Sequence, residues 1–256
     1  MGARISDAES DPRRRLALGL YESGLFRTWL GDRPEGWRLV SGLWSPIYLQ
    51  LRELPSHPAL LRVVGEVLAE ILRDEIPDAA TLVGIAYGGL PVAVAASLAS
   101  GIPSAMTRKL DLQASGDIGE ALAAYGEHAS VEGLIHSDSN VVLVDDLVTR
   151  FDSKLTAARQ VDHEIRRRHL HGVRCRDVLV VVDREQGGAE AARAHGFTLH
   201  AALGLRSQML PYLQERLAPI EYKIISAYLD DPNPFQDSRE QRRLSELATE
   251  ASPGSA

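Results

Sequence analysis

Two adjacent carboxylates, Asp145 and Asp146, directly follow the apolar run Val141–Val144. A run this short and rich in β-branched residues is typical of a strand that is buried on both faces of a parallel sheet. Ligands bind at the carboxyl ends of such strands, where paired carboxylates can accept hydrogen bonds from neighbouring sugar hydroxyls. The pair therefore predicts a ribose site, with a solvated turn that caps the next helix as the alternative.

The turn after the carboxylates carries hydroxyl groups at Thr149 and Ser153. Apolar residues then recur at helical spacing, at Leu155, Ala158, Val161 and Ile165. Free backbone N–H groups and the positive end of a helix bind phosphate, so we expect this turn to hold the 5′-phosphate of the sugar. Arg150 would either reach that phosphate or pair with Asp152 at the surface.

Five segments of the chain resemble one enzyme family. Val141–Lys154 is similar to the phosphoribosyl pyrophosphate (PRPP) signature of type I phosphoribosyltransferases. Four others resemble successive segments of orotate phosphoribosyltransferase, including the transferase domain fused into UMP synthase: Leu16–Phe26, Ser41–Arg52, Val83–Ser97 and Val180–Leu203. Because the segments occur in the family's order within Leu16–Leu203, chance is a poor explanation, and the chain is identified as a member of this family.

The resemblance implies an α/β fold of the type I phosphoribosyltransferases. This fold has a mostly parallel central sheet flanked by helices, with a small N-terminal hood, here up to Arg52, over the base. The implied reaction transfers phosphoribosyl from PRPP to orotate and gives orotidine 5′-phosphate and pyrophosphate, as in UMP synthesis. The resemblance also implies magnesium bound through the substrate rather than directly by protein ligands, and a homodimer in which Lys109 acts across the interface.

The resemblance places pyrophosphate-binding groups after two other predicted strands. Arg108 and Lys109 match the family's Arg-Lys pair and would stabilise negative charge on the leaving group. The alternative is a pair of solvated charges at a strand end. Gly88 and Gly89 match a turn in which backbone N–H groups approach pyrophosphate closely, because glycine has no side chain.

The expected base-binding residue is Arg184, which matches the family arginine that contacts orotate. Its planar guanidinium can donate hydrogen bonds to the carbonyl or carboxylate oxygens of the base. The alternative is an ion pair with Glu185 at a helix start. Thr149 is a second expected contact to the base.

Several positions depart from the family pattern. Ala123 stands where the family has a loop lysine that closes on pyrophosphate, so no catalytic residue is assigned, and His128 is the nearest substitute. Val40 replaces a lysine, while Phe151 and Asp152 replace the glycines of the phosphate turn. We expect Phe151 to obstruct the approach of phosphate to the backbone and Asp152 to add a like charge. Two alternatives follow: a phosphoribosyltransferase for another base, and a catalytically weak protein of this fold that binds PRPP or a nucleotide.

Composition predicts a soluble enzyme with one main domain. The 256 residues are 45% hydrophobic and 25% charged, which is enough to bury a sizeable core. The net charge of −7 argues against a nucleic-acid surface, so a polyanion must be bound by a local pocket. A single cysteine, Cys175, fits the reducing cytoplasm, and no apolar run approaches the roughly 20 residues that cross a bilayer.

Apolar strand candidates alternate with helical patterns along the chain, which predicts a mostly parallel sheet with right-handed crossovers. The predicted strands are Thr81–Ala86, Pro103–Thr107, Val141–Val144, Val178–Val182 and Thr198–Ala202. Helices are predicted around the apolar stripe Leu60–Ile71 and over Leu90–Ser100. We expect a flexible N-terminus over 1–15, one domain over 16–230, weak order in Leu110–Ser139, and a weakly ordered tail over 231–256.

Overall fold

The computed structural model describes residues 11–39, 41–110, 119, 121 and 129–251. The described chain divides into two compact units. One unit is formed by residues 54–204, and the other combines the residues before 54 with those from 205 onward. The unit of residues 54–204 contains the central sheet and every predicted site residue that the structure describes.

The central sheet confirms the predicted α/β fold. Among the described residues it has six strands in the order β10-β9-β8-β5-β6-β7, and all neighbours are parallel except β7, which runs antiparallel to β6. The strands are β5 (Ala79–Gly84), β6 (Ser104–Thr107), β7 (Val131–Glu132), β8 (Asn140–Val148), β9 (Arg174–Asp183) and β10 (Thr198–Gly204). All five predicted strands are present.

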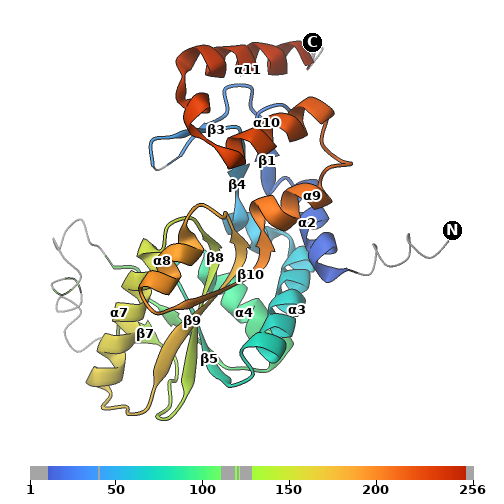
Figure 1. Ribbon diagram of the computed structural model, residues 1–256. Helices are drawn as coiled ribbons and strands as arrows, with labels where there is room; N and C mark the ends of the chain where they lie inside the picture. Colours follow the sequence, from blue (N-terminus) through green and yellow to red (C-terminus); the bar gives the residue numbers. More distant parts are fainter. Residues whose placement is uncertain (1–10, 40, 111–118, 120, 122–128, 252–256) are drawn as a thin grey trace. The chain divides into compact units, whose positions relative to one another are not determined.

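Helices cover both faces of this sheet. They are α3 (Pro58–Glu75), α4 (Gly89–Ser100), α7 (Asp152–Arg167) and α8 (Gly188–Ala194). Helices α3 and α4 lie on one face, whereas α7 and α8 lie on the other (Figure 1). The strand order explains this division, because right-handed crossovers that run outward in opposite directions place their helices on opposite faces.

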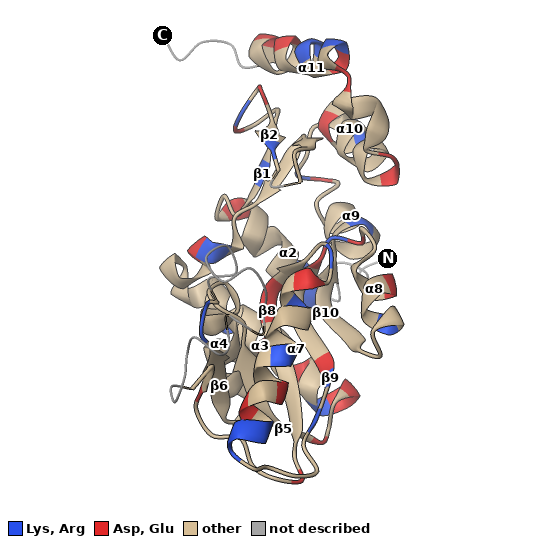
Figure 2. Ribbon diagram, turned by 90° about the vertical axis from the view of Figure 1, so that its left-hand side faces the viewer, with Lys and Arg blue, Asp and Glu red and all other residues tan. Residues whose placement is uncertain are grey.

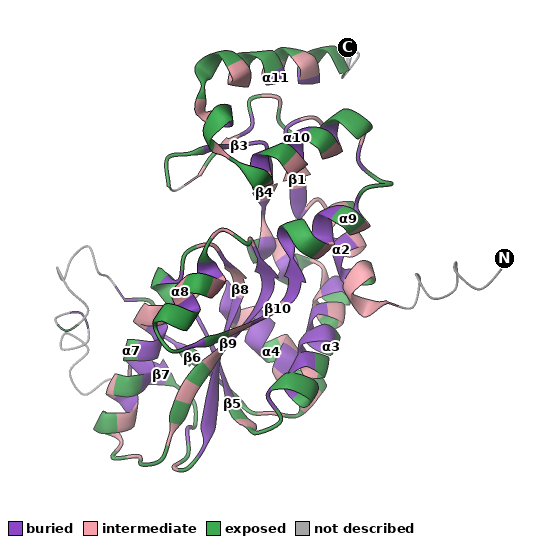
Figure 3. Ribbon diagram, viewed as in Figure 1, coloured by how far each residue is buried: buried purple, intermediate pink, exposed green. Residues whose placement is uncertain are grey.

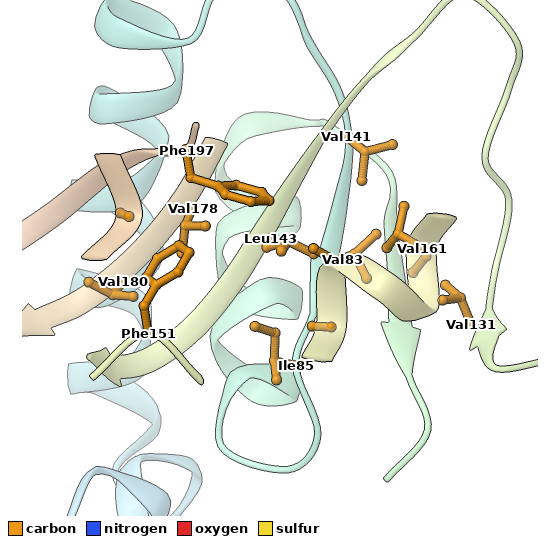
Figure 4. Close-up of a cluster of buried hydrophobic side chains, with 14 of the residues drawn as sticks. Val83, Ile85, Val131, Val141, Leu143, Phe151, Val161, Val178, Val180 and Phe197 are labelled. Atoms are coloured by element: carbon orange, nitrogen blue, oxygen red, sulfur yellow. The ribbon is translucent and has the colours of Figure 1, made fainter. Parts of the chain in front are cut away.

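The core follows the alternation of side chains along the strands. Val141 and Leu143 of β8, with Val178 and Val180 of β9, point toward α7 and are fully buried. Phe151 and Phe197 pack against this layer with their ring centroids 5.5 Å apart (Figure 4). Figure 3 shows the central strands as the most buried part of this unit. Val148, at the end of β8, belongs to the same cluster, so the strict alternation does not extend to the last residue of the strand.

The order of the strands reverses direction between β5 and β8. The chain moves outward from β5 to β6, and it then returns to place β8 on the other side of β5. In open α/β sheets, the crevice at the carboxyl ends of two such strands is the usual ligand site. The turns after β5 and β8 therefore lie where this class of fold usually binds its ligand.

The second unit is built from both ends of the described chain. Its elements before residue 54 are α2 (Pro12–Glu22), β1 (Phe26–Thr28), β2 (Trp37–Arg38), β3 (Trp44–Ser45), β4 (Ile47–Leu49) and the start of the 3-10 helix η1 (Leu51–Ser56). Its later elements are the π-helix η2 (Leu205–Met209), α9 (Leu210–Tyr212), α10 (Pro219–Asp230), the 3-10 helix η3 (Asn233–Gln236) and α11 (Ser238–Ala251). The expected role of the N-terminal segment as a hood over the base stays a prediction.

The segment after Asp230 is more ordered than its composition suggested. Helix α11 carries acidic and basic residues along its length (Figure 2), yet Leu244 and Ala248 on it are fully buried. The indole N–H of Trp29 donates to the Leu244 carbonyl at 3.1 Å. Gln236 of η3 hydrogen-bonds both backbone groups of Trp44. The tail thus packs on the N-terminal segment, which no local sequence pattern indicates.

Element boundaries differ most from the predictions at strands β8 and β9, and β9 begins at Arg174 rather than Val178. The predicted strand ended at Val144, whereas β8 continues to Val148 and so includes both carboxylates. Within Leu110–Ser139, the described part includes β7, which pairs with β6.

In the described part of the chain, no helix is long and apolar enough to span a lipid bilayer.

Candidate active site

The ends of four strands, β5, β6, β8 and β9, meet at the carboxyl edge of the sheet. Backbone and side-chain hydrogen bonds join these segments directly: Ile85 N–H to Val144 O at 2.9 Å, Ala86 N–H to Thr107 Oγ1 at 3.0 Å, and Arg184 N–H to Val148 O at 3.0 Å. The turn after β5 is thereby tied to both β8 and β6, and the turn after β9 is tied to β8. The structure therefore brings the predicted site segments together.

Asp145 and Asp146 point to opposite faces of the sheet. Both belong to β8, where successive side chains alternate. Asp145 lies on the α7 face and is 7% exposed. Its Oδ1 accepts the backbone N–H of Asp146 at 2.9 Å, and its Oδ2 accepts the Lys154 ammonium at 2.7 Å. Both oxygens of Asp145 thus accept hydrogen bonds within the protein. This differs from the prediction that the two carboxylates together accept hydrogen bonds from sugar hydroxyls.

Asp146 lies on the opposite face, against the turn that follows β5. A Cβ added at Gly88 would collide with the Asp146 carboxylate. One carboxylate oxygen accepts the backbone N–H of Leu147 at 2.8 Å. Burial, followed by the neighbouring charge of Asp145, raises the pKa of Asp146 to about 7. Asp146 is therefore the carboxylate that faces the turn between β5 and α4.

Gly88 and Gly89 allow the turn after β5 to pack directly on the end of β8. A Cβ on Gly89 would collide with the carbonyl oxygen of Val144, which is backbone and cannot rotate away. The N–H of Gly89 donates to the Ile85 carbonyl at 2.9 Å. The structure thus gives both glycines a packing reason, and their expected contact with pyrophosphate stays a prediction.

The turn after β8 runs through Thr149 and Arg150 into helix α7. Arg150 and Ser153 are exposed, Thr149 is half-buried, and Asp152 is an exposed residue of the first helical turn. The expectation that Phe151 obstructs the turn is wrong, because its ring points into the core and is only 2% exposed (Figure 4). The solvent side of the turn therefore carries backbone, hydroxyl and Arg150 groups.

Lys154 is a buried cation that sequence reasoning missed. Its ammonium donates to Asp145 Oδ2, to the Leu147 carbonyl at 2.6 Å and to Ser153 Oγ at 3.2 Å. The position of Lys154 in the sequence could have indicated this pairing. A lysine in the first turn of a helix is disfavoured by the positive helix end, so it implies a nearby acidic partner. Asp145, nine residues earlier, is that partner.

Arg108 and Lys109 follow β6 at the same edge. The Arg108 guanidinium pairs with Glu132 of β7, with 3.4 Å between Nε and Oε1. The Lys109 ammonium lies 5.4 Å from the ring centroid of Tyr87 in the turn after β5. Tyr87 is 65% exposed, so Lys109 stands at the solvent side of that turn. Lys109 is consequently beside the turn after β5, and Arg108 is beside β7.

Arg184 follows β9, and its turn contacts the turn after β8. Asp183 accepts the backbone N–H of Glu185 at 2.8 Å, and burial raises the pKa of the Asp183 carboxyl. At the start of α8, a Cβ on Gly188 would lie within 3.4 Å of Val148 and of the carbonyl of Thr149. The predicted base contacts, Arg184 and Thr149, are thus on adjacent turns. Val40, Ala123 and His128 lie outside the described residues.

The fold is that of a phosphoribosyltransferase-like α/β protein. The crystal structure of Mycobacterium tuberculosis orotate phosphoribosyltransferase in complex with PRPP matches with a TM-score of 0.54 and 26% identity, over 76% of this chain and 97% of that chain. No protein-family model matches the sequence.

Two sequence relatives define the family more narrowly. Orotate phosphoribosyltransferase of Methanopyrus kandleri is 32% identical over 75% of this chain and 88% of its own length. Uridine 5′-monophosphate synthase of Caenorhabditis elegans is 32% identical over 76% of this chain, and the chain spans 35% of that longer protein. The chain belongs to the orotate phosphoribosyltransferase family, as the sequence motifs predicted.

Proposed function

We propose that the protein transfers phosphoribosyl from PRPP to orotate and releases orotidine 5′-phosphate and pyrophosphate. The observation that carries this proposal is the position of Asp146 at the carboxyl end of β8, against the turn between β5 and α4. There its carboxylate can accept hydrogen bonds from ribose hydroxyls, while the turn with Thr149, Arg150 and Ser153 receives the 5′-phosphate. Family membership supports the same assignment.

Bond breaking at C1 of the ribose leaves negative charge on pyrophosphate. Lys109 lies next to the turn after β5, where we expect this charge to develop, and a preorganised cation there lowers the barrier. Arg108, the preceding residue, pairs with Glu132 of β7 and would add positive charge at the same edge of the sheet. Magnesium, when bound, screens the pyrophosphate oxygens. Among the described residues no three acidic, histidine or cysteine side chains gather into a metal site, so the ion would be held mainly by substrate oxygens, with Asp146 nearby.

The base would lie against the turn after β9. Arg184 can donate in a plane to the carboxylate or carbonyl oxygens of orotate, and Thr149 on the adjacent turn can add a hydroxyl contact. Loss of a hydrogen bond to a charged group costs about 1.5–3 kcal/mol, so Arg184→Ala should raise the KM for orotate about 10- to 100-fold. The KM for PRPP should change little.

The test is an assay of pyrophosphate release with PRPP, magnesium and single bases. Turnover with orotate supports the proposal, and Arg193→Ala, an exposed arginine on α8, serves as the control for Arg184→Ala. Turnover with a different base only would indicate a phosphoribosyltransferase of other specificity. Binding of PRPP without turnover would indicate a catalytically weak PRPP-binding protein.

We also propose that a second copy of the chain covers an apolar groove between α3, α4 and β6. The groove has a volume of about 840 Å³, and Leu61, Leu90 and Pro91 line it. On its border Val94, Leu98 and Met106 are 47%, 83% and 44% exposed. Exposed apolar residues gathered in this way are typical of an interface between proteins. The groove adjoins β6, which leads to Lys109, so a dimer formed there would place a partner close to the site.

Measurement of the molar mass in solution tests the homodimer. Leu98→Glu should convert a dimer to a monomer, because a buried charge opposes association. Ile220→Glu, which adds the same charge at an exposed apolar residue of the other unit, should leave the mass unchanged. A monomeric wild-type protein would exclude this interface.

A cytoplasmic location also remains part of the proposal and is supported by the single cysteine.

A further inference from the structure

Lys154 is almost completely removed from solvent. Its side chain is 4% exposed and that of Asp145 is 9% exposed. Lysine is rarely buried to this degree unless it is paired, because its ammonium loses hydration that protein groups must replace. An ammonium has three N–H donors, and here three acceptors surround it. The lysine is therefore a fixed part of the structure and does not reach for a ligand.

The three acceptors of Lys154 lie on both sides of the phosphate turn. Asp145 and the Leu147 carbonyl precede the turn on β8, whereas Ser153 follows it at the start of α7. Pairing with Asp145 alone would compensate the buried charge. The bonds to Leu147 and Ser153 do more, because they tie the entry of the turn to its exit.

Phe151 fixes the middle of the same turn. Its ring is buried against Phe197, and the Phe151 carbonyl accepts the backbone N–H groups of Lys154 and Leu155, both at 3.1 Å. Residues 147–153 contain no glycine. A turn without glycine that is held by two buried anchors has few alternative conformations, so little ordering remains to be done when an anion binds.

We propose that Lys154 is a positioning residue, which holds residues 147–153 in the conformation that receives the 5′-phosphate. Lys154 also neutralises Asp145, so that Asp146 is the carboxylate that accepts hydrogen bonds from the ribose hydroxyls. This inference rests on the proposed PRPP site. It assigns Lys154 to the affinity for PRPP and to neither the chemical step nor the recognition of the base.

The decisive variants separate charge compensation from positioning. Lys154→Met leaves Asp145 as an uncompensated buried carboxylate and should be markedly less stable in urea. Lys154→Met combined with Asp145→Asn removes both charges and should recover most of that stability. If Lys154 positions the turn, the double variant still binds PRPP at least tenfold more weakly than the wild type in calorimetry. Its kcat at saturating PRPP and its KM for orotate should stay within about threefold of wild type.

Arg159→Met is the matched control, because Arg159 is an exposed cation on the same helix. It should bind PRPP as the wild type does. Lys154→Arg keeps the charge but cannot make three short hydrogen bonds from one atom, so it should fold and still bind PRPP more weakly.

Two outcomes would overturn the inference. If the double variant is stable and binds PRPP with wild-type affinity, Lys154 only compensates a charge. If the wild type binds no PRPP, the turn is not a phosphate site. Failure of the proposed function is seen separately, as a wild type that binds PRPP but does not turn over orotate, and in that case the binding comparison still decides the role of Lys154.

Discussion

The Asp146 carboxylate should make the protein less stable as the pH rises from about 4 to 7. Its pKa is raised from 3.8 to about 7 in the folded protein, first by burial and then by the charge of Asp145. Below pH 4 the residue is protonated in the folded and unfolded states and costs nothing. Between pH 4 and pH 7 the unfolded chain loses this proton more readily than the folded protein, which favours unfolding, and above pH 7 the full penalty is present.

The size of this penalty follows from the shift. One pKa unit corresponds to about 1.4 kcal/mol, so a rise of about three units amounts to about 4 kcal/mol at pH 8. At pH 5 the folded protein keeps Asp146 protonated, and the penalty is about 2 kcal/mol. Asp146→Asn removes the charge at similar volume. We therefore expect it to stabilise the protein by about 4 kcal/mol at pH 8 and about 2 kcal/mol at pH 5.

Urea unfolding of the wild type and of Asp146→Asn at both pH values measures this difference. Asp162→Asn, at an exposed position of α7, is the control and should change stability by less than about 0.5 kcal/mol. A stability gain that is the same at pH 5 and pH 8 would refute the assignment of a raised pKa to Asp146. A less stable variant would show that the carboxylate contributes to folding. Asp146→Asn should also lose most of its PRPP affinity. Higher stability together with weaker binding would show that the Asp146 carboxylate serves binding at the expense of stability.

Three further changes test the packing around the site. Phe151→Ala should lower the free energy of unfolding by about 3–5 kcal/mol, because the ring fills the core, and it should weaken PRPP binding; unaltered stability would mean that the ring lies elsewhere. Gly89→Ala should cost about 1–3 kcal/mol, since backbone must shift, against about 1 kcal/mol for Gly24→Ala, where a Cβ meets no atom. Burial opposes ionisation of Glu164, but hydrogen bonds from Arg167 and Arg168 outweigh it and lower its pKa to about 2. Glu164→Gln should therefore cost about 3 kcal/mol in urea unfolding at pH 7 and much less near pH 2, because this stability is lost as pH falls below 4.5.

The sequence was sufficient to predict the fold and to predict that the candidate site residues lie at one edge of the sheet. Runs such as Val178–Val182 are apolar on both faces and can only be central strands of a covered sheet. The carboxyl ends of parallel strands lie at one edge, so residues after separate strands were correctly expected to meet. The unpredicted packing of Leu244 against Trp29 depends on two segments far apart in the chain, and no local pattern encodes such a contact.

The opposite directions of Asp145 and Asp146 depended on where the strand was expected to end. A strand that stops at Val144 leaves the pair in a turn, where both side chains can face one ligand. A strand that continues to Val148 must alternate them. Polar residues at a strand end carry no apolar signal, so periodicity cannot locate this boundary.

The direction of the Phe151 ring, by contrast, could have been inferred. Phe151, Leu155 and Ala158 are spaced four and three residues apart, so Phe151 extends the apolar stripe of α7 by one turn. Comparison with a glycine turn considers only the space around the backbone, whereas the periodicity of α7 determines where the Phe151 ring lies.

The arrangement of charge at the site shows how an acidic chain can still accept a polyanion. The net charge of −7 gives no long-range attraction for PRPP, so each cation must act at close range. Lys154 compensates the charge of Asp145 within the protein, so Asp146 is the remaining carboxylate of the pair. Since like charges repel most strongly where water is excluded, compensating one of two neighbouring carboxylates reduces the repulsion that the phosphates meet. A buried ion pair can therefore contribute to anion binding without touching the anion.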